Sequence, residues 1–365
     1  MRFNGQVTTD RAYARAGVDP GRSGRAVAGL VEVLSGIDPG GPSRSVVPSG
    51  HYASVLRLDE RTGLALATDG VGTKIVVAEA LGRYDTVGID CVAMNANDLV
   101  CVGAEPIALL DYIAVEEADP EMLRGLAEGL ARGAEQAGIE IPGGELAELP
   151  EVVRGHPSPR GFELVGTCAG TVALDEIVTG AAIEPGDAIL GLPASGVHSN
   201  GLTLARATLP DLAERPPELG GRSVGEELLI PTTIYVRAIL ALLAEPEIEV
   251  RGLAHITGDG LLNLLRLDAD VGYRIDAPLP VPAIFELIAE RSGASASEMH
   301  EVFNMGCGFS CVVRSQHASA AAALLEPFHP GAKVIGSVTS TRGVVELPPV
   351  GLAGDRAGGL AAVRR

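Results

Sequence analysis

The segment from Asp69 to Lys74 reads Asp-Gly-Val-Gly-Thr-Lys and gathers an acid, two glycines, a hydroxyl and an ammonium in one short loop. Glycines lack a Cβ atom, so backbone N–H groups there can approach a ligand closely. Lys74 is one of two lysines among 28 basic residues, and lysine is a compact point charge whereas arginine is a wide planar fork. The pattern is typical of a loop that binds a metal-bound phosphate, and the alternative is a β-turn with a surface lysine.

A second group of polar residues runs from Asp90 to Asp98 inside an apolar stretch. Residues 88–102 are predicted to form a helix, on which Asp90, Asn97 and Asp98 fall near one face. Carboxylates and amides on an otherwise apolar helix are costly unless they are paired or bind a metal. Two interpretations are open, a cation site or a set of buried hydrogen bonds.

Three further glycine-rich segments carry polar side chains, namely Gly143-Gly144-Glu145, Ser195–Gly201 and His255–Gly260. The first is expected to be a turn that presents Glu145 to a cation, or else a solvated loop. The second lies between a predicted strand and a predicted helix, a context in which backbone N–H groups bind anions, and its histidine is typical of a site. The third is a strand-to-loop junction or an ordinary turn. Several carboxylates with few fixed cations favour Mg²⁺, which prefers oxygen ligands.

Composition limits the partners. The net charge of −19 disfavours nucleic acid and anionic membranes, but it is compatible with a nucleotide ligand. Aromatic residues make up 3% of the chain and tryptophan is absent, so the cores must be aliphatic. The five cysteines have no CxxC spacing and are predicted to be buried thiols in a reducing compartment. With no apolar signal segment and no apolar run long enough to span a membrane, the protein is predicted to be cytoplasmic.

The length favours two domains, and strands alternate with helices without regular βαβ spacing, so an α+β fold is favoured over a doubly wound sheet. The clearest helix is expected between Asp119 and Gly138, with Asp119 as the N-cap, Pro120 in the first turn and Gly138 as the C-terminal cap. The expected organisation is an N-terminal arm over 1–50, an N-terminal domain over 51–174, a C-terminal domain over 175–350 and a frayed tail over 351–365.

In this order and spacing, the motifs resemble those of the phosphoribosylformylglycinamidine cyclo-ligase (aminoimidazole ribonucleotide synthetase) family, in its archaeal-type variant. The matching segments are Ala16–Asp19, Asp69–Lys74, Tyr84–Pro106, Ser195–Gly201, Pro231-Thr232, His255–Gly260 and Phe303–Gly306. Pro48–Ala53 is closer to the archaeal-type loop than to the bacterial one. Leu146 replaces a threonine of the family pattern, and Asp259 replaces a glycine.

The resemblance implies a two-domain fold in which the N-terminal domains of two subunits pair into a β-barrel, with active sites at the dimer interface and an α/β-sandwich as the C-terminal domain, and it implies that the domain over 51–174 binds ATP and dimerises. It also implies ATP-dependent closure of formylglycinamidine ribonucleotide to 5-aminoimidazole ribonucleotide in purine biosynthesis. The formyl oxygen attacks the γ-phosphate of ATP to give an iminophosphate. The ribose-bearing nitrogen then attacks the formyl carbon, and phosphate leaves.

Residue roles follow from the same resemblance. The implied catalytic residues are Lys74 and His198. ATP or phosphate binding is implied for Asp69, Gly70, Gly72, Thr73, Lys74, Asn97 and Asp98. Substrate binding is implied for Ser195, Gly196, His198, Ser199, Asn200, His255 and Thr257. The implied Mg²⁺ ligands are Asp69, Asp98, Glu145 and Asp259.

Leu146 and Asp259 leave an alternative open, a catalytically silent or divergent nucleotide-binding paralogue of the same fold. Among enzymes with related folds, selenophosphate synthetase usually needs a reactive cysteine near its N-terminus, whereas the first cysteine here is Cys91.

Overall fold

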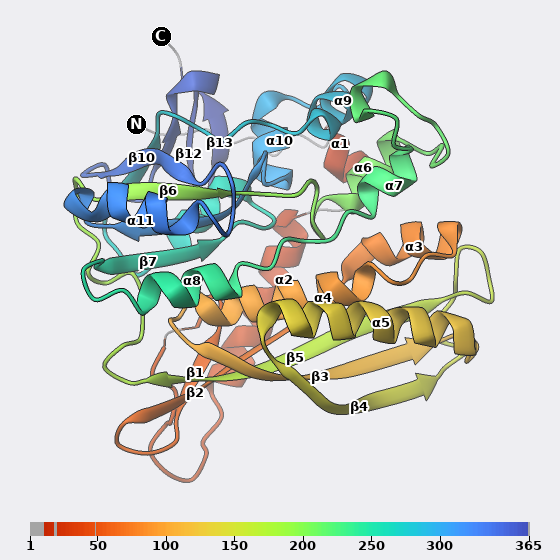
Figure 1. Cartoon of the computed structure of the whole chain (residues 1–365), viewed down its shortest axis with the longest axis horizontal. Coiled ribbons are helices and arrows are strands. Elements are labelled where there is room, and N and C mark those ends of the chain that lie inside the picture. Colours follow the sequence, from red (N-terminus) through yellow and green to blue (C-terminus); the bar gives the residue numbers. More distant parts are fainter. Residues whose placement is uncertain (1–10, 18–19, 48, 364–365) are drawn as a thin grey trace.

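The first half of the chain forms a five-stranded sheet in the order β1-β2-β5-β3-β4 (Figure 1). Neighbouring strands are antiparallel, except that β3 and β4 are parallel. The structure is a computed structural model and describes residues 11–17, 20–47 and 49–363. The strands of this sheet are β1 (Ser54–Arg57), β2 (Thr62–Gly70), β3 (Glu105–Val115), β4 (Glu140–Glu148) and β5 (Phe162–Ala173).

Two long helices, α4 (Val87–Val100) and α5 (Pro120–Ala137), cover one face of this sheet (Figure 1). As predicted, Asp119 caps α5, accepting two N–H groups of its first turn at 2.7 and 3.1 Å, and Gly138 ends it with φ of 75°. The two helices approach closely at Gly88, where a Cβ atom would lie 2.3 Å from the Leu130 nitrogen. Glycine is therefore required at this crossing, and α4 is held firmly between the sheet and the second domain.

The second half forms an eight-stranded mixed sheet in the order β13-β12-β11-β8-β10-β6-β9-β7. Within this second sheet, β11 and β8 are the one parallel pair among its described strands. The prediction of a frayed tail over 351–365 is wrong for the described part of that segment, because β12 and β13 pair there as an antiparallel hairpin at the edge of the sheet. The strands are β6 (Ala188–Pro193), β7 (Val250–His255), β8 (Gly272–Ile275), β9 (Cys307–Val313), β10 (Lys333–Thr339), β11 (Val345–Leu347), β12 (Leu352–Asp355) and β13 (Gly359–Ala362).

Shorter helices complete the two-domain α+β fold, with α11 on the larger sheet and α8 between α11 and the helices of the first domain (Figure 1). Among the described residues, every helix is too short or too polar to serve as a membrane span. All five cysteines are buried and unbridged, as predicted. The helices are α3 (Ile75–Leu81), α6 (Leu202–Thr208), α7 (Val224–Leu228), α8 (Val236–Leu243), α9 (Ala283–Ser292), α10 (Ala296–Val302) and α11 (Ala318–Leu325), with 3₁₀ turns at η1 (Gly72–Lys74), η2 (Pro217–Leu219), η3 (Gly260–Arg266), η4 (Ser315–His317) and η5 (Pro348–Val350).

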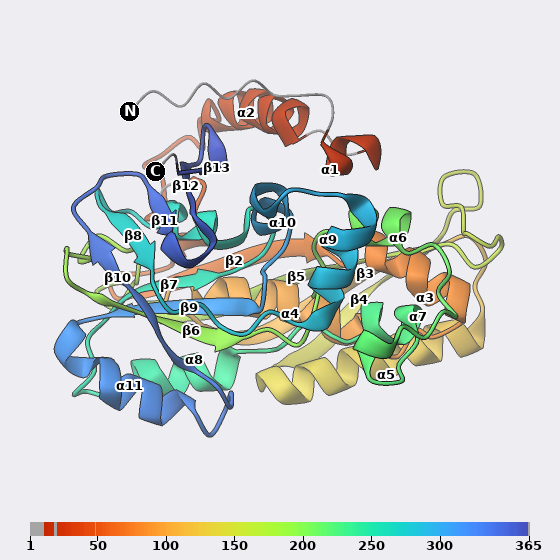
Figure 2. The same cartoon turned by 90° about the horizontal axis from the view of Figure 1, so that it is seen from above.

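The N-terminal arm contains α1 (Ala12–Arg15) and α2 (Pro20–Ser35), and α2 runs along the outside of the molecule (Figure 2). The backbone N–H of Tyr13 donates to Glu298 Oε1 at 2.8 Å, so α1 is attached to α10 of the second domain. Part of the predicted Ala16–Asp19 motif, and Pro48, lie outside the described residues.

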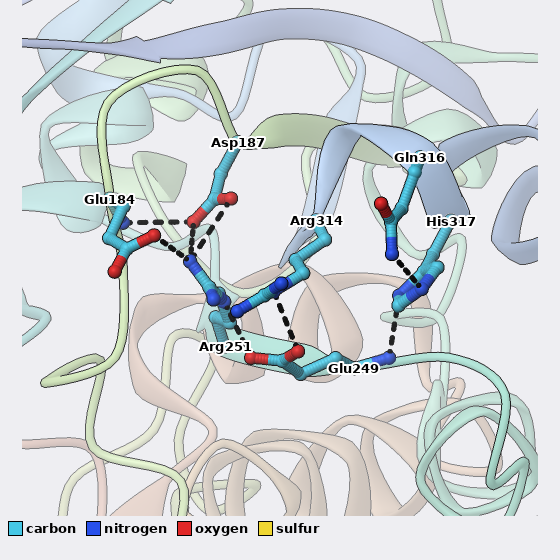
Figure 3. Close-up of polar contacts among 7 residues, drawn as sticks. All are labelled: Glu184, Asp187, Glu249, Arg251, Arg314, Gln316 and His317. Atoms are coloured by element: carbon cyan, nitrogen blue, oxygen red, sulfur yellow. Dashed lines mark hydrogen bonds and ion pairs between the residues drawn. The ribbon is translucent and has the colours of Figure 1, made fainter.

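A cluster of charged side chains ties the turn before β6 to the larger sheet (Figure 3). Arg251 on β7 is buried and contacts Asp187 at 3.1 Å, Glu184 at 3.0 Å and Glu249 at 2.8 Å. Glu249 also pairs with Arg314 at 2.7 Å. This cluster fixes the start of the second domain, because Glu184 and Asp187 lie in the turn directly before β6, the first strand of the second domain.

Candidate active site

The end of β2 and the last turn of α4 bring two predicted metal ligands, Asp69 and Asp98, near each other. Asp69 keeps solvent-exposed surface, yet partial withdrawal from water and then repulsion by Asp98 raise its pKa to about 6. Asp98 Oδ1 lies 2.9 Å from Nδ1 of His255, which is fully buried at the end of β7. The raised pKa of Asp69 beside a second carboxylate favours a cation, because a positive charge would relieve the repulsion between the two acids.

Asn95 and Asn97 on α4 use their amides for structural hydrogen bonds. Asn95 Nδ2 donates to the Asp69 carbonyl at 3.1 Å, which fixes the end of β2. Asn97 Nδ2 donates to the Thr233 carbonyl at 2.9 Å, and its Oδ1 accepts the Tyr235 N–H at 2.9 Å. Asn97 therefore joins the two domains, and a contact between Asn97 and ATP stays a prediction.

Lys74 is fully buried, so the alternative of a surface lysine is wrong. Its Nζ donates to Asp90 Oδ1 at 2.9 Å and to the Ile230 carbonyl at 2.6 Å, and lies 2.9 Å from Asp90 Oδ2. Asp90 Oδ1 also accepts the N–H and the hydroxyl of Thr232 at 2.7 and 2.6 Å. For Asp90 the interpretation as buried hydrogen bonding fits the structure, and phosphate binding by Lys74 stays a prediction.

His198 lies in a turn with φ of 60° and is only 2% exposed. Its Nε2 accepts the backbone N–H groups of Ser195 at 3.2 Å and Thr233 at 3.4 Å. Nδ1 must therefore carry the proton, and it has no hydrogen-bond partner among the described residues. Burial holds the pKa of His198 well below its usual range, so the ring is neutral. A proton-shuttle role is not tested by this arrangement.

The glycine-rich motifs converge at the boundary between the domains. Ser195 Oγ donates to the Pro231 carbonyl at 2.6 Å, and Ser199 Oγ lies 3.3 Å from Thr232 Oγ1. A Cβ atom on Gly72 would lie 3.8 Å from the Ser199 carbonyl oxygen, so the first glycine loop contacts the serine–histidine loop. The other inter-loop contacts are Thr73 Oγ1 with Thr203 Oγ1 at 3.1 Å, Asn304 Nδ2 with the Gly196 carbonyl at 2.9 Å, and a Gly258 Cβ position 3.8 Å from Asn200 Oδ1.

Thr257 and Asp259 lie in the loop between β7 and η3. Asp259 has φ of 71°, a conformation that explains why a glycine suits this position in the family pattern. Asn263 Nδ2 donates to the carbonyls of Gly258 at 2.6 Å and Gly260 at 2.8 Å, and so fixes the loop. Metal binding by Asp259 stays a prediction.

Glu145 is placed differently from its predicted turn, because Gly143-Gly144-Glu145 lies within strand β4. Asp69, Gly166, Asp111 and Gly144 form one row across β2, β5, β3 and β4. At the usual strand spacing, β4 lies about 14 Å from β2. The structure therefore does not bring Glu145 beside Asp69, and in the described part of the chain no three His, Cys, Asp or Glu side chains form a ready metal site.

Asp111 is a neighbouring acid that the sequence reasoning missed. A Cβ atom on Gly144 would lie 2.4 Å from Asp111 Oδ1, so the carboxylate covers the glycine, and burial raises the pKa of Asp111. The sequence did contain a signal for Asp111, because it is an acidic residue inside the otherwise apolar predicted strand 106–115.

A cavity of about 550 Å³ opens beside the segment 230–234. It contains Arg237 and His329 and no acidic side chain, although the chain is strongly acidic. Its other lining residues are Ile89, Gln136, Ser195, Ile230, Pro231, Thr232, Thr233, Ile234, Ala238 and Phe328.

Comparison with known proteins shows the family to which the chain belongs. The family model described as AIR synthase related protein, N-terminal domain, matches residues 50–172, and the model for the C-terminal domain of the same family matches residues 184–347. A phosphoribosylformylglycinamidine cyclo-ligase of Thermococcus kodakarensis is 46% identical over 334 residues, covering 89% of this chain and 95% of the relative. The chain belongs to the phosphoribosylformylglycinamidine cyclo-ligase family. The resemblance predicted from the motifs is confirmed.

Other members of the family are similar to this chain over comparable lengths. The cyclo-ligase of Methanothermobacter thermautotrophicus is 46% identical over 341 residues, covering 92% of this chain and 96% of the relative. Among solved structures, AaThiL complexed with AMPPCP and TMP has a TM-score of 0.60 at 15% identity, covering 88% of this chain and 92% of that one. The HypE-HypF complex has a TM-score of 0.59 at 19% identity, covering 86% and 93%. These two similarities establish the shared fold.

Proposed function

We propose that this protein closes formylglycinamidine ribonucleotide to 5-aminoimidazole ribonucleotide at the expense of ATP, as a cyclo-ligase of purine biosynthesis. The observation that carries the proposal is the convergence of the family's separated motifs at one domain boundary, in a chain 46% identical to a named cyclo-ligase. The formyl oxygen of the substrate attacks the γ-phosphate and ADP leaves. The ribose-bearing nitrogen then attacks the formyl carbon, and phosphate leaves.

For this reaction the protein acts mainly by positioning and charge neutralisation. The bare backbone of Gly70 and Gly72, with the Thr73 hydroxyl, would receive the phosphates of ATP. Asp69 and Asp98 would hold Mg²⁺, and their mutual repulsion supports this assignment. The bound ion would neutralise charge on the triphosphate. Asp259 is proposed as a further ligand, and Glu145, which the sheet holds away from Asp69, would serve a separate ion.

The ribonucleotide would lie against the serine–histidine loop and the loop after β7. The proposed contacts are Ser195, Gly196, His198, Ser199, Asn200, His255 and Thr257. Because His198 is neutral and fixed by two backbone N–H groups, its first contribution would be to hold this loop in shape. A proton transfer by His198 would require its ring to leave this position.

We also propose that two chains pair through their first domains. Helices cover one face of the five-stranded sheet, while the opposite face is bare (Figure 1). On that face Leu110 is 52% exposed and Tyr112 is 40% exposed. Exposed apolar patches on a sheet mark interaction surfaces. Pairing of two such faces would give the dimeric β-barrel, in a cytoplasmic enzyme.

The test of the proposed function is ADP release with and without formylglycinamidine ribonucleotide. Release that depends on the ribonucleotide, with an aminoimidazole product, supports the ring closure. ATP binding without turnover would instead indicate a silent paralogue.

A further inference from the structure

A buried chain of polar contacts crosses the boundary between the two domains. It begins at Lys74, passes through Asp90 and ends on the backbone and hydroxyl of Thr232. Lys74 and Asp90 are both 0% exposed. The contacts therefore join the first glycine loop and α4 to the segment 230–233 of the second domain, and the ion pair has no solvent-exposed surface.

The segment 230–233 in turn holds the proposed substrate loop. The Pro231 carbonyl accepts from Ser195 Oγ at 2.6 Å, and the Thr233 N–H donates to His198 Nε2 at 3.4 Å. The Thr232 hydroxyl lies 3.3 Å from Ser199 Oγ. Three side chains of one loop thus depend on the position of a single neighbouring segment.

Helix α4 holds this segment at two points. Asp90 binds Thr232, and Asn97 binds the Thr233 carbonyl and the Tyr235 N–H. Asp90 and Asn97 are about two helical turns apart, so they present the same face of α4. A rigid helix therefore sets the position of the segment relative to Asp98, which lies one residue further along.

Resting on the proposed function, we infer that Lys74 and Asp90 are positioning residues, which fix the segment 230–233 and through it Ser195, His198 and Ser199 for the ribonucleotide. An ammonium has three N–H donors, and here it has three oxygen neighbours, two from Asp90 and one from Ile230. Two of these donors bond Asp90 Oδ1 and the Ile230 carbonyl, and Asp90 Oδ2 lies 2.9 Å from the same ammonium. The pair is also buried from solvent, whereas Asp69 of the proposed cation site is solvent-exposed.

The same geometry explains why lysine remains at this position in a chain so rich in arginine. A guanidinium is wider than an ammonium and carries five donors in a fixed plane. In a fully buried site with three oxygen acceptors, it would leave donors unpaired and displace its neighbours. The unusual residue type is therefore explained by packing around a point charge.

The test compares Lys74→Met, Asp90→Asn and the double variant with Lys333→Met, which removes the only other lysine, an exposed one. For each protein the KM and the directly measured Kd of the ribonucleotide, the Kd of ATP and the thermal midpoint are determined. Each single variant is expected to weaken ribonucleotide binding by about 10-fold or more, because small misplacements in a site are costly, while ATP affinity changes by less than about 3-fold. The double variant should recover part of the loss, since neither charge is then left unpaired.

Two results would overturn the inference. One is a loss of ATP affinity in Lys74→Met alone, with Asp90→Asn unaffected, which would make Lys74 a phosphate ligand. The other is a lower thermal midpoint with unchanged ribonucleotide affinity, which would make the pair purely structural. If Lys74→Met does not fold, Thr232→Val is compared with Thr232→Ser, which keeps the hydroxyl on Asp90 and should restore affinity. Absence of ring closure in the wild type would count against the proposed function only, because the binding constants still test the positioning.

Discussion

Nδ1 of His255 lies 2.9 Å from Oδ1 of Asp98, so the buried end of β7 orients a carboxylate on the last turn of α4. The Asp98 side chain is 19% exposed, and its charge helps to raise the pKa of Asp69. The contact fixes one acid of the proposed cation pair from the second domain. One residue of the proposed cation site is therefore oriented by the packing of the two domains against each other.

Asp98→Asn is expected to lower kcat by about 10²-fold or more while the fold is retained, because the amide can still bond His255 but cannot neutralise a cation. Kinetics at saturating Mg²⁺ and the thermal midpoint measure the two effects. Asp270→Asn, an exposed acid paired with Arg342, is the matched control. Near wild-type kcat in Asp98→Asn would show that the metal assignment is wrong.

The pKa of Asp69, raised to about 6, predicts how cation binding depends on pH. Below pH 6 a proton occupies the carboxylate, so Mg²⁺ affinity should fall by about tenfold per pH unit, and Asp69→Asn should lose this dependence. Because the folded pKa lies above the ordinary value of 3.8, ionisation of Asp69 lowers the stability of the metal-free fold. This loss of stability is absent below about pH 4 and complete above about pH 6. Calorimetric titration with Mg²⁺ from pH 5 to 8 tests the predicted change in affinity, and an Mg²⁺ affinity that does not change with pH would contradict the prediction.

Arg251→Met should lower the free energy of unfolding by about 3–5 kcal/mol, because it leaves Asp187 buried without its partner (Figure 3). The comparison is Arg342→Met, which breaks an exposed ion pair and should cost about 0–1 kcal/mol. Chemical denaturation of both variants measures the difference. Equal losses would mean that the buried cluster stabilises the fold no more than an exposed ion pair does.

Sedimentation velocity at micromolar concentration should give a dimer for the wild type. Leu110→Lys and Tyr112→Lys should shift it towards monomer, since each places a charge on the bare sheet face. Val350→Lys, which changes an exposed apolar residue of the second domain, should leave the dimer intact. A monomeric wild type would refute the pairing.

Local signals predicted much of the fold. The helix from Pro120 to Ala137 was predictable because its caps act within one turn. Strand β4 was missed because Gly143-Gly144 is typical of a turn, whereas here Gly144 provides room for Asp111 on the neighbouring strand. The room for Asp111 is required only because β3 pairs with β4, and the residues around Gly143-Gly144 do not indicate that pairing.

The sequence singled out the glycine-rich motifs that meet at the domain boundary, but it did not predict which contacts their side chains make. Asp90, Asn97 and Asp98 fall on one side of α4 as expected, but only Asp98 lies beside Asp69. Asp90 and Asn97 are bound by Lys74, Thr232 and Thr233, partners from distant segments. The choice between a cation site and buried hydrogen bonds therefore depended on the docking of the two domains.

The most direct test of the central claim is a stoichiometric assay with ATP, Mg²⁺ and formylglycinamidine ribonucleotide, in which ADP and 5-aminoimidazole ribonucleotide are measured together. The proposed function predicts one ADP released for each aminoimidazole formed, and negligible ADP release without the ribonucleotide. Tight ATP binding with no aminoimidazole, or ADP release that does not depend on the ribonucleotide, would contradict it.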